Sequence, residues 1–460
     1  MHNISFVENE DFIEKARNLR PFYFIVVCWG KRYSDFLLDY CISALLSPNN
    51  IPALHNHGKN KFLIATTDDD WKYMQLSPVF KLLSSYVEPI KISISPPPKD
   101  LGACIHMGLG HKLATQIAFE DKAYAVLLTP DLMVSDATMA AVQRRAVEGY
   151  HMYLVAALRF GEEPLFKHLQ DIYGKNLKTQ FSDKFCPISL SGRQMVAAGI
   201  KSFHSETLTY EWNAPHFSSF PVACWWKSTN GDGILVHSLS WAPLMIDYAA
   251  VEKHDTSTMD NWTIDGDYVY KNFGVSKKVY ISQDSDECML ISWAPLDDKP
   301  MSTEPRKILL YKFLSNWVKK VILYDTYFNP VFDPLKRKLF LLPVRWHVND
   351  LDNEWVLLEN KALNLIEDSV GFKTLVIHNT FFNLAFLRSK LNALFIKNLH
   401  SIARILHRIF YMFNFSWERK DRIAMIAVKA LSGDSVARDR ISRYFCFVMI
   451  VLFGINIKKK

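Results

Sequence analysis

Apolar segments of strand length alternate with segments of helical spacing over the first third of the chain. The first apolar run, PFYFIVVCW at 21–29, is continuous and rich in β-branched and aromatic residues, which is typical of a strand buried on both faces. A segment of helical spacing, SDFLLDYCISALL, follows it, and the pattern then repeats. The predicted strands span 21–29, 61–67, 91–95, 123–128 and 152–158, and the predicted helices span 34–46, 76–87, 108–123 and about 136–149.

This alternation predicts an α/β fold with a mainly parallel sheet and helices on both of its faces. Ligands of such sheets bind beyond the carboxyl ends of the strands. Polar residues follow three of the predicted strands, at 30–33 (GKRY), 68–70 (DDD) and 129–131 (TPD). We expect these segments to converge, so that Asp131 lies at the mouth of a ligand crevice and not inside the core.

The composition is that of a globular protein. Hydrophobic residues make up 49% of the 460 positions and charged residues 22%, so the chain can bury one large or two ordinary cores. The seven cysteines lack C-x-x-C spacing and, being odd in number, cannot all pair within the chain, which favours a reducing compartment. The N-terminal segment has acidic residues where an export signal needs basic and apolar ones, so we expect a cytoplasmic protein.

The basic residues are concentrated near the C-terminal end. Residues 381–460 carry 15 Lys and Arg against 4 acidic residues, a net charge of +11, which leaves −4 for the rest of a chain whose total is +7. Apolar residues alternate at spacings of four and three along 392–413, which predicts a basic amphipathic helix. The last apolar segment, 444–457, has 14 uncharged residues, whereas a helix that spans a membrane needs about 20.

Two interpretations of residues 381–460 compete. They form a helical subdomain on the body of the protein, or they hold it on the cytoplasmic face of an anionic membrane, where each basic residue contributes about 1 kcal/mol. Nucleic acid is not an expected partner, because the aromatic residues lie on the apolar faces and not among the basic residues. We therefore divide the chain into a sheet domain (1–300), a connecting subdomain of mixed character (301–380) and a basic helical tail (381–460).

Residues 20–300 resemble the GT-A nucleotide-sugar glycosyltransferases in the order of their features. The first strand runs into VVCWGKRY, the second ends in ATTDDD, and the helix GHKLATQIAFEDKA enters a strand that ends in LLTPD. The resemblance implies a GT-A-like enzyme that transfers a sugar from a nucleotide-diphosphate donor to a glycan, lipid-linked or protein acceptor. The residues expected at the donor site are Trp29, Gly30, Tyr33, Asp68, Asp69, His111 and Lys112.

The resemblance also implies a metal site and a catalytic base. In that family an Asp-x-Asp motif binds a divalent ion; Asp131 matches its final Asp, whereas Thr129 occupies the first position, so the motif is incomplete. His237 would complete the metal site, and Asp265 or Asp267 would deprotonate the acceptor. Mn²⁺ or Mg²⁺ is the implied ion, since both bind carboxylate oxygen and would offset the charge on the departing pyrophosphate.

The same residues also have structural interpretations. Asp131 would cap the segment after its strand, His111 would be a surface residue, His237 a core histidine, and the segment TIDGD a turn between strands. A sugar nucleotidyltransferase would use a similar sheet with a Gly-rich loop after the first strand, and a non-catalytic membrane-associated scaffold would need none of the acids. The sequence has no G-x-x-x-x-G-K-[ST], H-E-x-x-H or G-x-S-x-G motif.

Overall fold

The computed structural model describes residues 10–56, 58–98, 101–173, 185–264, 266–274, 278–296 and 309–371. The chain divides into two units, Met1–Thr374 and Leu375–Lys460, and all described residues belong to the first. The predicted basic tail, 381–460, lies outside the described residues. Within the described ranges, no helix has both the length and the apolar character needed to cross a bilayer.

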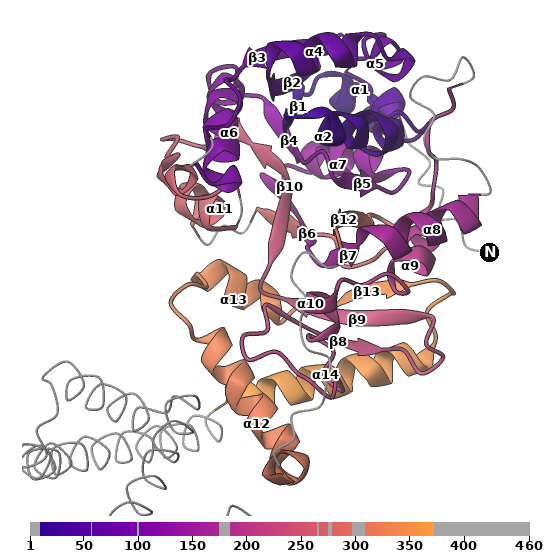
Figure 1. The fold of residues 1–460 in the computed structure, drawn as a ribbon, viewed down its shortest axis with the longest axis vertical. Helices are drawn as coiled ribbons and strands as arrows, with labels where there is room; N and C mark the ends of the chain where they lie inside the picture. The colour runs from indigo at the N-terminus through magenta and orange to yellow at the C-terminus, as the bar shows by residue number, and fades with distance from the viewer. Residues whose placement is uncertain are drawn as a thin grey trace, which may run out of the picture. The chain divides into compact units, whose positions relative to one another are not determined.

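A seven-stranded sheet forms the centre of the first unit (Figure 1). Its strand β10 runs antiparallel to both neighbours, β4 and β6, and every other pairing in the sheet is parallel. The predicted mainly parallel α/β sheet is therefore confirmed. The strands, in order across the sheet, are β11 (Val279–Ile281), β6 (Met152–Ala156), β10 (Trp241–Asp247), β4 (Tyr124–Leu128), β1 (Phe22–Val27), β2 (Lys61–Thr66) and β3 (Glu88–Ser93).

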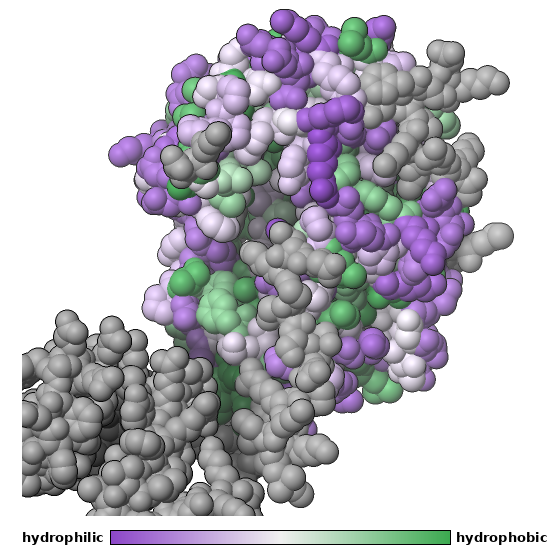
Figure 2. All heavy atoms as spheres, in the orientation of Figure 1, coloured by the Kyte–Doolittle hydropathy of each residue, from purple (hydrophilic) through white to green (hydrophobic). Residues whose placement is uncertain are grey.

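Both faces of this sheet are covered. Alternate residues of β1 enter different clusters: Ile25 and Val27 pack with α6 (Ala103–Glu120), whereas Phe24 and Val26 pack with helices of the opposite face. Those helices include α5 (Pro78–Leu83) and α7 (Thr138–Val147). In Figure 2, hydrophilic side chains gather over the upper and right-hand parts of the face shown, and hydrophobic ones also reach the surface.

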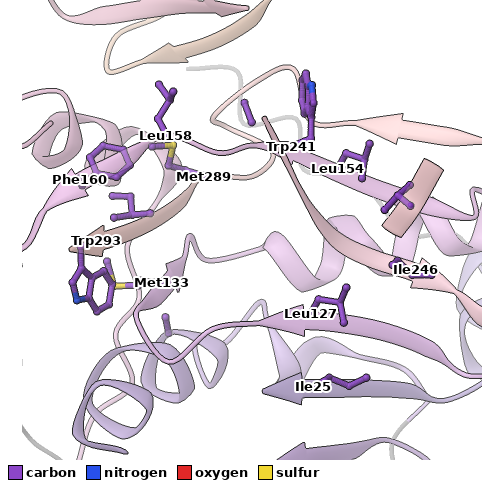
Figure 3. Close-up of a cluster of buried hydrophobic side chains, with 14 of the residues drawn as sticks. Ile25, Leu127, Met133, Leu154, Leu158, Phe160, Trp241, Ile246, Met289 and Trp293 are labelled. Atoms are coloured by element: carbon purple, nitrogen blue, oxygen red, sulfur yellow. The ribbon is translucent and has the colours of Figure 1, made fainter. Parts of the chain in front are cut away.

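Two small sheets extend this core. In the first, β12 (Leu290–Ala294) lies between β5 (Leu132–Val134) and β7 (Arg159–Gly161). Figure 3 shows that the apolar cluster continues from the large sheet into this one, through Met133 and Trp293. In the second sheet, β9 (Gly233–Ser238) lies between β8 (Ala223–Lys227) and β13 (Val344–His347).

Residues 309–371 pack with the rest of the first unit. They supply β13 to the second small sheet. Helices α12 (Leu309–Tyr327) and α14 (Asn353–Val370) contribute Leu323 and Trp355 to a cluster that also contains Trp226 of β8. The remaining helices are α1 (Glu10–Arg17), α2 (Lys31–Phe36), α3 (Ser43–Leu45), α4 (Asp68–Gln75), α8 (Glu162–Tyr173), α9 (Gly192–Gly199), α10 (Ser205–Leu208), α11 (Gly266–Phe273) and α13 (Pro334–Phe340), with a π-helical turn at Leu37–Ile42 and 3₁₀ turns at Ile51–Ala53, Tyr248–Ala250 and Ser257–Asp260.

Helix α6 begins five residues earlier than the sequence predicts and contains two glycines that make close contacts. A Cβ on Gly108 would lie 2.3 Å from the Met259 carbonyl oxygen and 2.5 Å from that of Trp262. A Cβ on Gly110 would lie 2.6 Å from a methyl carbon of Val27 in β1. The glycines weaken the intrinsic helix preference of this segment but allow the helix to approach both the sheet and the segment before α11.

We predict that Gly108→Ala destabilises the protein by roughly 2 kcal/mol in urea unfolding, because the backbone carbonyls that the new methyl group meets cannot move as a flexible side chain can. Gly102→Ala is the matched control, since no atom lies within 4 Å of a Cβ at the start of the same helix, and it should cost less than about 1 kcal/mol. Equal stability of the two variants would show that the close contact between Gly108 and the carbonyls of Met259 and Trp262 does not require glycine.

Candidate functional site

The strand order places a switch point between β1 and β4. From β1 the chain adds β2 and then β3 on one side, whereas β4 pairs with the other side of β1. Crevices for ligands form at the carboxyl edge of a sheet at such a point. Residues 28–33 and 129–131 follow β1 and β4 at this edge. Since α6 leads into β4, its N-terminal turn lies at the same edge.

The turns after β1 and β2 are in direct contact. The Gly30 N–H donates a hydrogen bond of 2.9 Å to Oδ2 of Asp70, and the Thr67 hydroxyl donates to the same oxygen at 2.7 Å. Gly30 has a φ of 81°, a conformation that favours glycine, and it immediately precedes α2. Asp70 is thus held against the start of α2 by neutral donors.

The carboxylate of Asp131 lies near the same point. Burial raises the pKa of the Cys28 thiol, and the negative charges of Asp70 and Asp131 raise it further. Two carboxylates that follow different strands therefore act on one buried sulfur at the end of β1. The predicted convergence holds for the residues after β1, β2 and β4.

Asp131 itself has an unusual environment for a carboxylate. Its residue is partly exposed, but burial of the carboxyl group raises its pKa, and the Thr129 hydroxyl and the positive charge of Arg159 offset only part of that rise. Arg159 is exposed at the start of β7 and makes no ion pair with the side chains of the described ranges. A carboxylate with so little compensation favours the approach of a cation.

The aromatic residues expected at the donor site lie on either side of the turn after β1. Trp29 is half-buried, and its ring meets the edge of the buried His106 of α6 with the centroids 4.9 Å apart. Tyr33 is exposed on α2, with its ring 6.1 Å from that of Phe36. Both residues belong to the segment that directly follows β1.

Asp68 and Asp69 lie in the first turn of α4, with Thr67 as its N-cap. Acidic residues are favoured there because they face the unpaired N–H groups of the helix start. Asp68 pairs with Lys91 of β3, and Asp69 is exposed. Their position at the carboxyl edge agrees with the sequence prediction, while their contacts are those of a helix N-terminus.

The structure gives His111 and Lys112 partners within the protein. His111 is buried in α6, with its Nδ1 2.9 Å from the Thr263 hydroxyl, and Lys112 forms an ion pair with Asp260. Both contacts fix α6 to the segment that precedes α11. His111 is therefore buried, whereas its structural interpretation from sequence placed it at the surface.

His237 and Asp131 are not brought together. His237 is fully buried in β9 of the second small sheet, where its Nδ1 lies 2.8 Å from the Phe340 carbonyl oxygen and its ring packs near Trp226. Asp131, in contrast, immediately precedes β5 of the first small sheet. Asp267 lies in the first turn of α11, paired with Lys336 of α13, and Asp265 lies outside the described residues.

A different group of side chains could hold a metal ion. Among the described residues, one atom each from Asp284, Asp286 and His347 come within 4.8 Å of one another. Asp284 and Asp286 follow β11 at the carboxyl edge of the large sheet, and His347 ends β13. The sequence carries a visible signal for this group, the D-S-D at 284–286, but nothing local marks His347 as its partner.

Electrostatics at this second group differ from those at Asp131. Burial disfavours the charge of Asp284, but the hydrogen bonds from His347 and from the Asp286 N–H, together with the positive charges of His347 and Arg345, outweigh burial and lower the pKa of the carboxyl. Burial likewise disfavours the charge of His347, but the hydrogen bonds to Asp284 and to the Asn349 carbonyl, together with the negative charges of Asp284 and Asp286, outweigh burial and raise the pKa of the imidazole. These acids are therefore already balanced by positive charge.

Two buried histidines should make stability depend on pH. Burial lowers the pKa of His111 and of His237 to about 4, against 6.5 in an unfolded chain. Their contribution is complete above pH 6.5 and is lost as the pH falls toward 4, because protonation then favours the unfolded state. His237→Gln keeps a donor for Phe340 and should reduce the loss of unfolding free energy between pH 7 and pH 4 by roughly 3 kcal/mol in urea denaturation. An unchanged loss in the variant would contradict a neutral buried His237.

Comparison with known proteins gives no relative from which a function can be transferred. No protein-family model matches the chain, and no curated protein sequence is significantly similar to it. The function is therefore argued from the fold and from the side chains that the fold brings together.

Proposed function

We propose that the protein is a glycosyltransferase that binds a nucleotide-diphosphate sugar beyond the carboxyl ends of β1 and β4. The observation that carries the proposal is the meeting of the turns after β1, β2 and β4 at the switch point of a mainly parallel sheet. The Gly30 N–H donates to Asp70 there, and the pairing of β1 with β4 brings the segment of Asp131 to the same edge. The mainly parallel sheet, with polar residues after three of its strands, supports the proposal. Trp29 and Tyr33 would flank the donor at this point.

The charges near Asp131 suit the departure of a nucleotide diphosphate. Negative charge grows on the diphosphate as the sugar leaves, and an enzyme stabilises it with fixed cations or a divalent ion. Mg²⁺ and Mn²⁺ are commonly held by one or two carboxylates together with the phosphates of the substrate. Asp131 alone can meet that requirement, and Arg159 lies close enough to influence its pKa.

The acceptor base would come from the segment at the start of α11. Asp267 is half-exposed and Lys336 binds its carboxylate. The adjoining segment contacts α6 through Thr263 and Asp260, and α6 begins at the edge of the sheet where the donor would bind. We propose Asp265 or Asp267 for this role, which requires that the carboxylate reach the acceptor hydroxyl.

The turn after β1 separates this proposal from a sugar nucleotidyltransferase. Such an enzyme would need a Gly-rich loop there, whereas here Gly30 passes directly into α2 at Lys31. A non-catalytic scaffold would have no use for a desolvated carboxylate, Asp131, at a switch point. Donor binding is the property that distinguishes the enzyme from the scaffold.

We predict that Asp131→Asn lowers sugar transfer by roughly 100-fold or more while the protein remains folded, since the change is nearly isosteric. A thermal-shift screen of nucleotide sugars with and without Mn²⁺ identifies the donor first, because a ligand of the folded state raises its apparent stability. Asp11→Asn, on the exposed face of α1, is the matched control and should behave as wild type. Full activity of Asp131→Asn, or no stabilisation by any nucleotide sugar, would refute the proposal.

We also propose that residues 381–460 hold the enzyme at an anionic membrane surface, beside a lipid-linked or membrane-proximal acceptor. The support is their net charge of +11 together with the amphipathic spacing of 392–413.

We predict that the full chain co-sediments with anionic vesicles more than with neutral ones, and that salt weakens the difference as the Debye length falls from about 10 Å at 0.1 M to about 3 Å at 1 M. A chain ending at residue 380 should lose vesicle binding and keep donor binding. Negligible binding of the full chain to both kinds of vesicle would exclude membrane attachment.

A further inference from the structure

We infer that Asp284, Asp286 and His347 bind one divalent first-row transition-metal ion, at the junction between the large sheet and the second small sheet. The inference is independent of sugar transfer, because none of these residues belongs to the proposed donor site. It rests on the orientation of a buried imidazole, on the spacing of two carboxylates, and on the side chains that hold them.

The imidazole of His347 is prepared to act as a ligand. Its side chain is only 2% exposed, and its Nδ1 lies 2.7 Å from the Asn349 carbonyl oxygen, to which it donates its proton. Nε2 is thereby turned toward the two carboxylates. A metal-binding histidine characteristically donates its other ring N–H to such an acceptor, which fixes both the tautomer and the direction of the ring.

The carboxylate oxygens lie where an ion would bridge them. Nε2 of His347 is 2.9 Å from Oδ1 of Asp284 and 3.9 Å from Oδ2 of Asp286. Ligand bonds of about 2.0–2.2 Å place neighbouring ligand atoms roughly 3–4 Å apart around one ion. The ion would accept the lone pair of Nε2 and one lone pair from each carboxylate, and any proton on Nε2 would pass to solvent.

Hydrogen bonds of the backbone and of Ser285 fix the loop that carries the two acids. The Asp286 N–H donates to Oδ1 of Asp284 at 2.8 Å, and the Ser285 hydroxyl accepts from the His347 N–H at 3.1 Å. These bonds tie the acids and the histidine together through the backbone. The Ser285 N–H also donates to the carbonyl oxygen of Arg345 at 2.9 Å, so β13 is joined to the residues after β11.

Arg193 orients Asp286 from the first turn of α9. Its Nε and Nη2 donate to the two oxygens of Asp286 at 2.8 and 2.7 Å, and its Nη1 donates to Asp350 at 2.7 Å. The helix can approach so closely because residue 192 is glycine, where a Cβ would lie 1.6 Å from the Ser285 carbonyl oxygen. Each carboxylate oxygen has two lone pairs, so Arg193 leaves acceptor sites on Asp286 for an ion.

One imidazole and two carboxylates select the class of ion. Zn²⁺ and Mn²⁺ accept both kinds of ligand, whereas Mg²⁺ prefers oxygen alone. Three protein ligands leave open positions for water. Solvent reaches the group through the half-exposed Asp286, and a small cavity of about 100 Å³, lined in part by Asn349 and Asp350, lies beside it.

The test is metal titration of the reduced, full-length protein after chelation. Calorimetry with Zn²⁺, Mn²⁺ and Mg²⁺ should show one ion per chain for Zn²⁺ and Mn²⁺ at this site and at least tenfold weaker binding of Mg²⁺, about the loss expected for a mismatched donor set. His347→Gln and Asp286→Asn should each weaken Zn²⁺ binding by about tenfold or more, because each removes or neutralises a ligand. Co²⁺ bound in place of Zn²⁺ should give visible absorption bands that His347→Gln abolishes.

His151→Gln is the matched control, since this histidine lies outside the group, and its Zn²⁺ affinity should equal that of wild type. Thermal unfolding of each variant without metal shows whether it folds, and Asp286→Asn serves if His347→Gln does not. Equal Zn²⁺ affinity in wild type and in both ligand variants, or no 1:1 binding of Zn²⁺ or Mn²⁺ to wild type, would overturn the inference. Nucleotide-sugar binding should persist in the ligand variants, so this result and the donor-site result can be distinguished.

Discussion

β1 can carry polar chemistry only at its ends, and the rest of the structure depends on that constraint. All six of its residues are buried, β2 and β4 pair with its two edges, and side chains of helices cover both faces. A backbone so enclosed has no spare hydrogen-bonding groups along its length. The first accessible polar atoms follow at Trp29 and Gly30, where the chain leaves the sheet. The position of the candidate donor site is therefore a consequence of how completely the strand is buried.

The mainly parallel sheet was predictable from sequence because buried parallel strands have continuous apolar sequences. The antiparallel strand β10 was not, since its direction depends on a pairing with β4 and β6 that no local pattern records. The same limit applies to the side chains. The place of Asp131 followed from the end of its strand, whereas the partners of His111 and His237, Thr263 and Phe340, are distant in sequence. The D-S-D sequence at 284–286 could be recognised as a possible metal-binding pair, but only the fold shows that His347 lies beside it.

One edge of the sheet presents two kinds of acidic environment. After β4, Asp131 is desolvated and weakly compensated, so the protein itself disfavours its charge. After β11, Arg193 and His347 supply positive charge to the acids, and the carboxyl group of Asp284 ionises more readily than usual. The first arrangement leaves the carboxylate short of partners, while in the second Arg193 and His347 hold the acids in place and still leave acceptor sites on Asp286. The difference in pKa between these carboxyl groups comes from the side chains around them, because all of them are aspartates.

The central position of β10 has a consequence for the order in which the chain can fold. β10 separates β4 from β6, yet it follows both in sequence and is reached only at residues 241–247. Until that segment has been synthesised, β4 and β6 each expose an unpaired edge, which is a surface open to association with other chains. The sheet cannot close from its N-terminal strands alone. A nascent chain of this protein must therefore protect the free edge of β4 and both edges of β6 while residues 157–240 emerge from the ribosome, a period in which a chaperone would have most to offer.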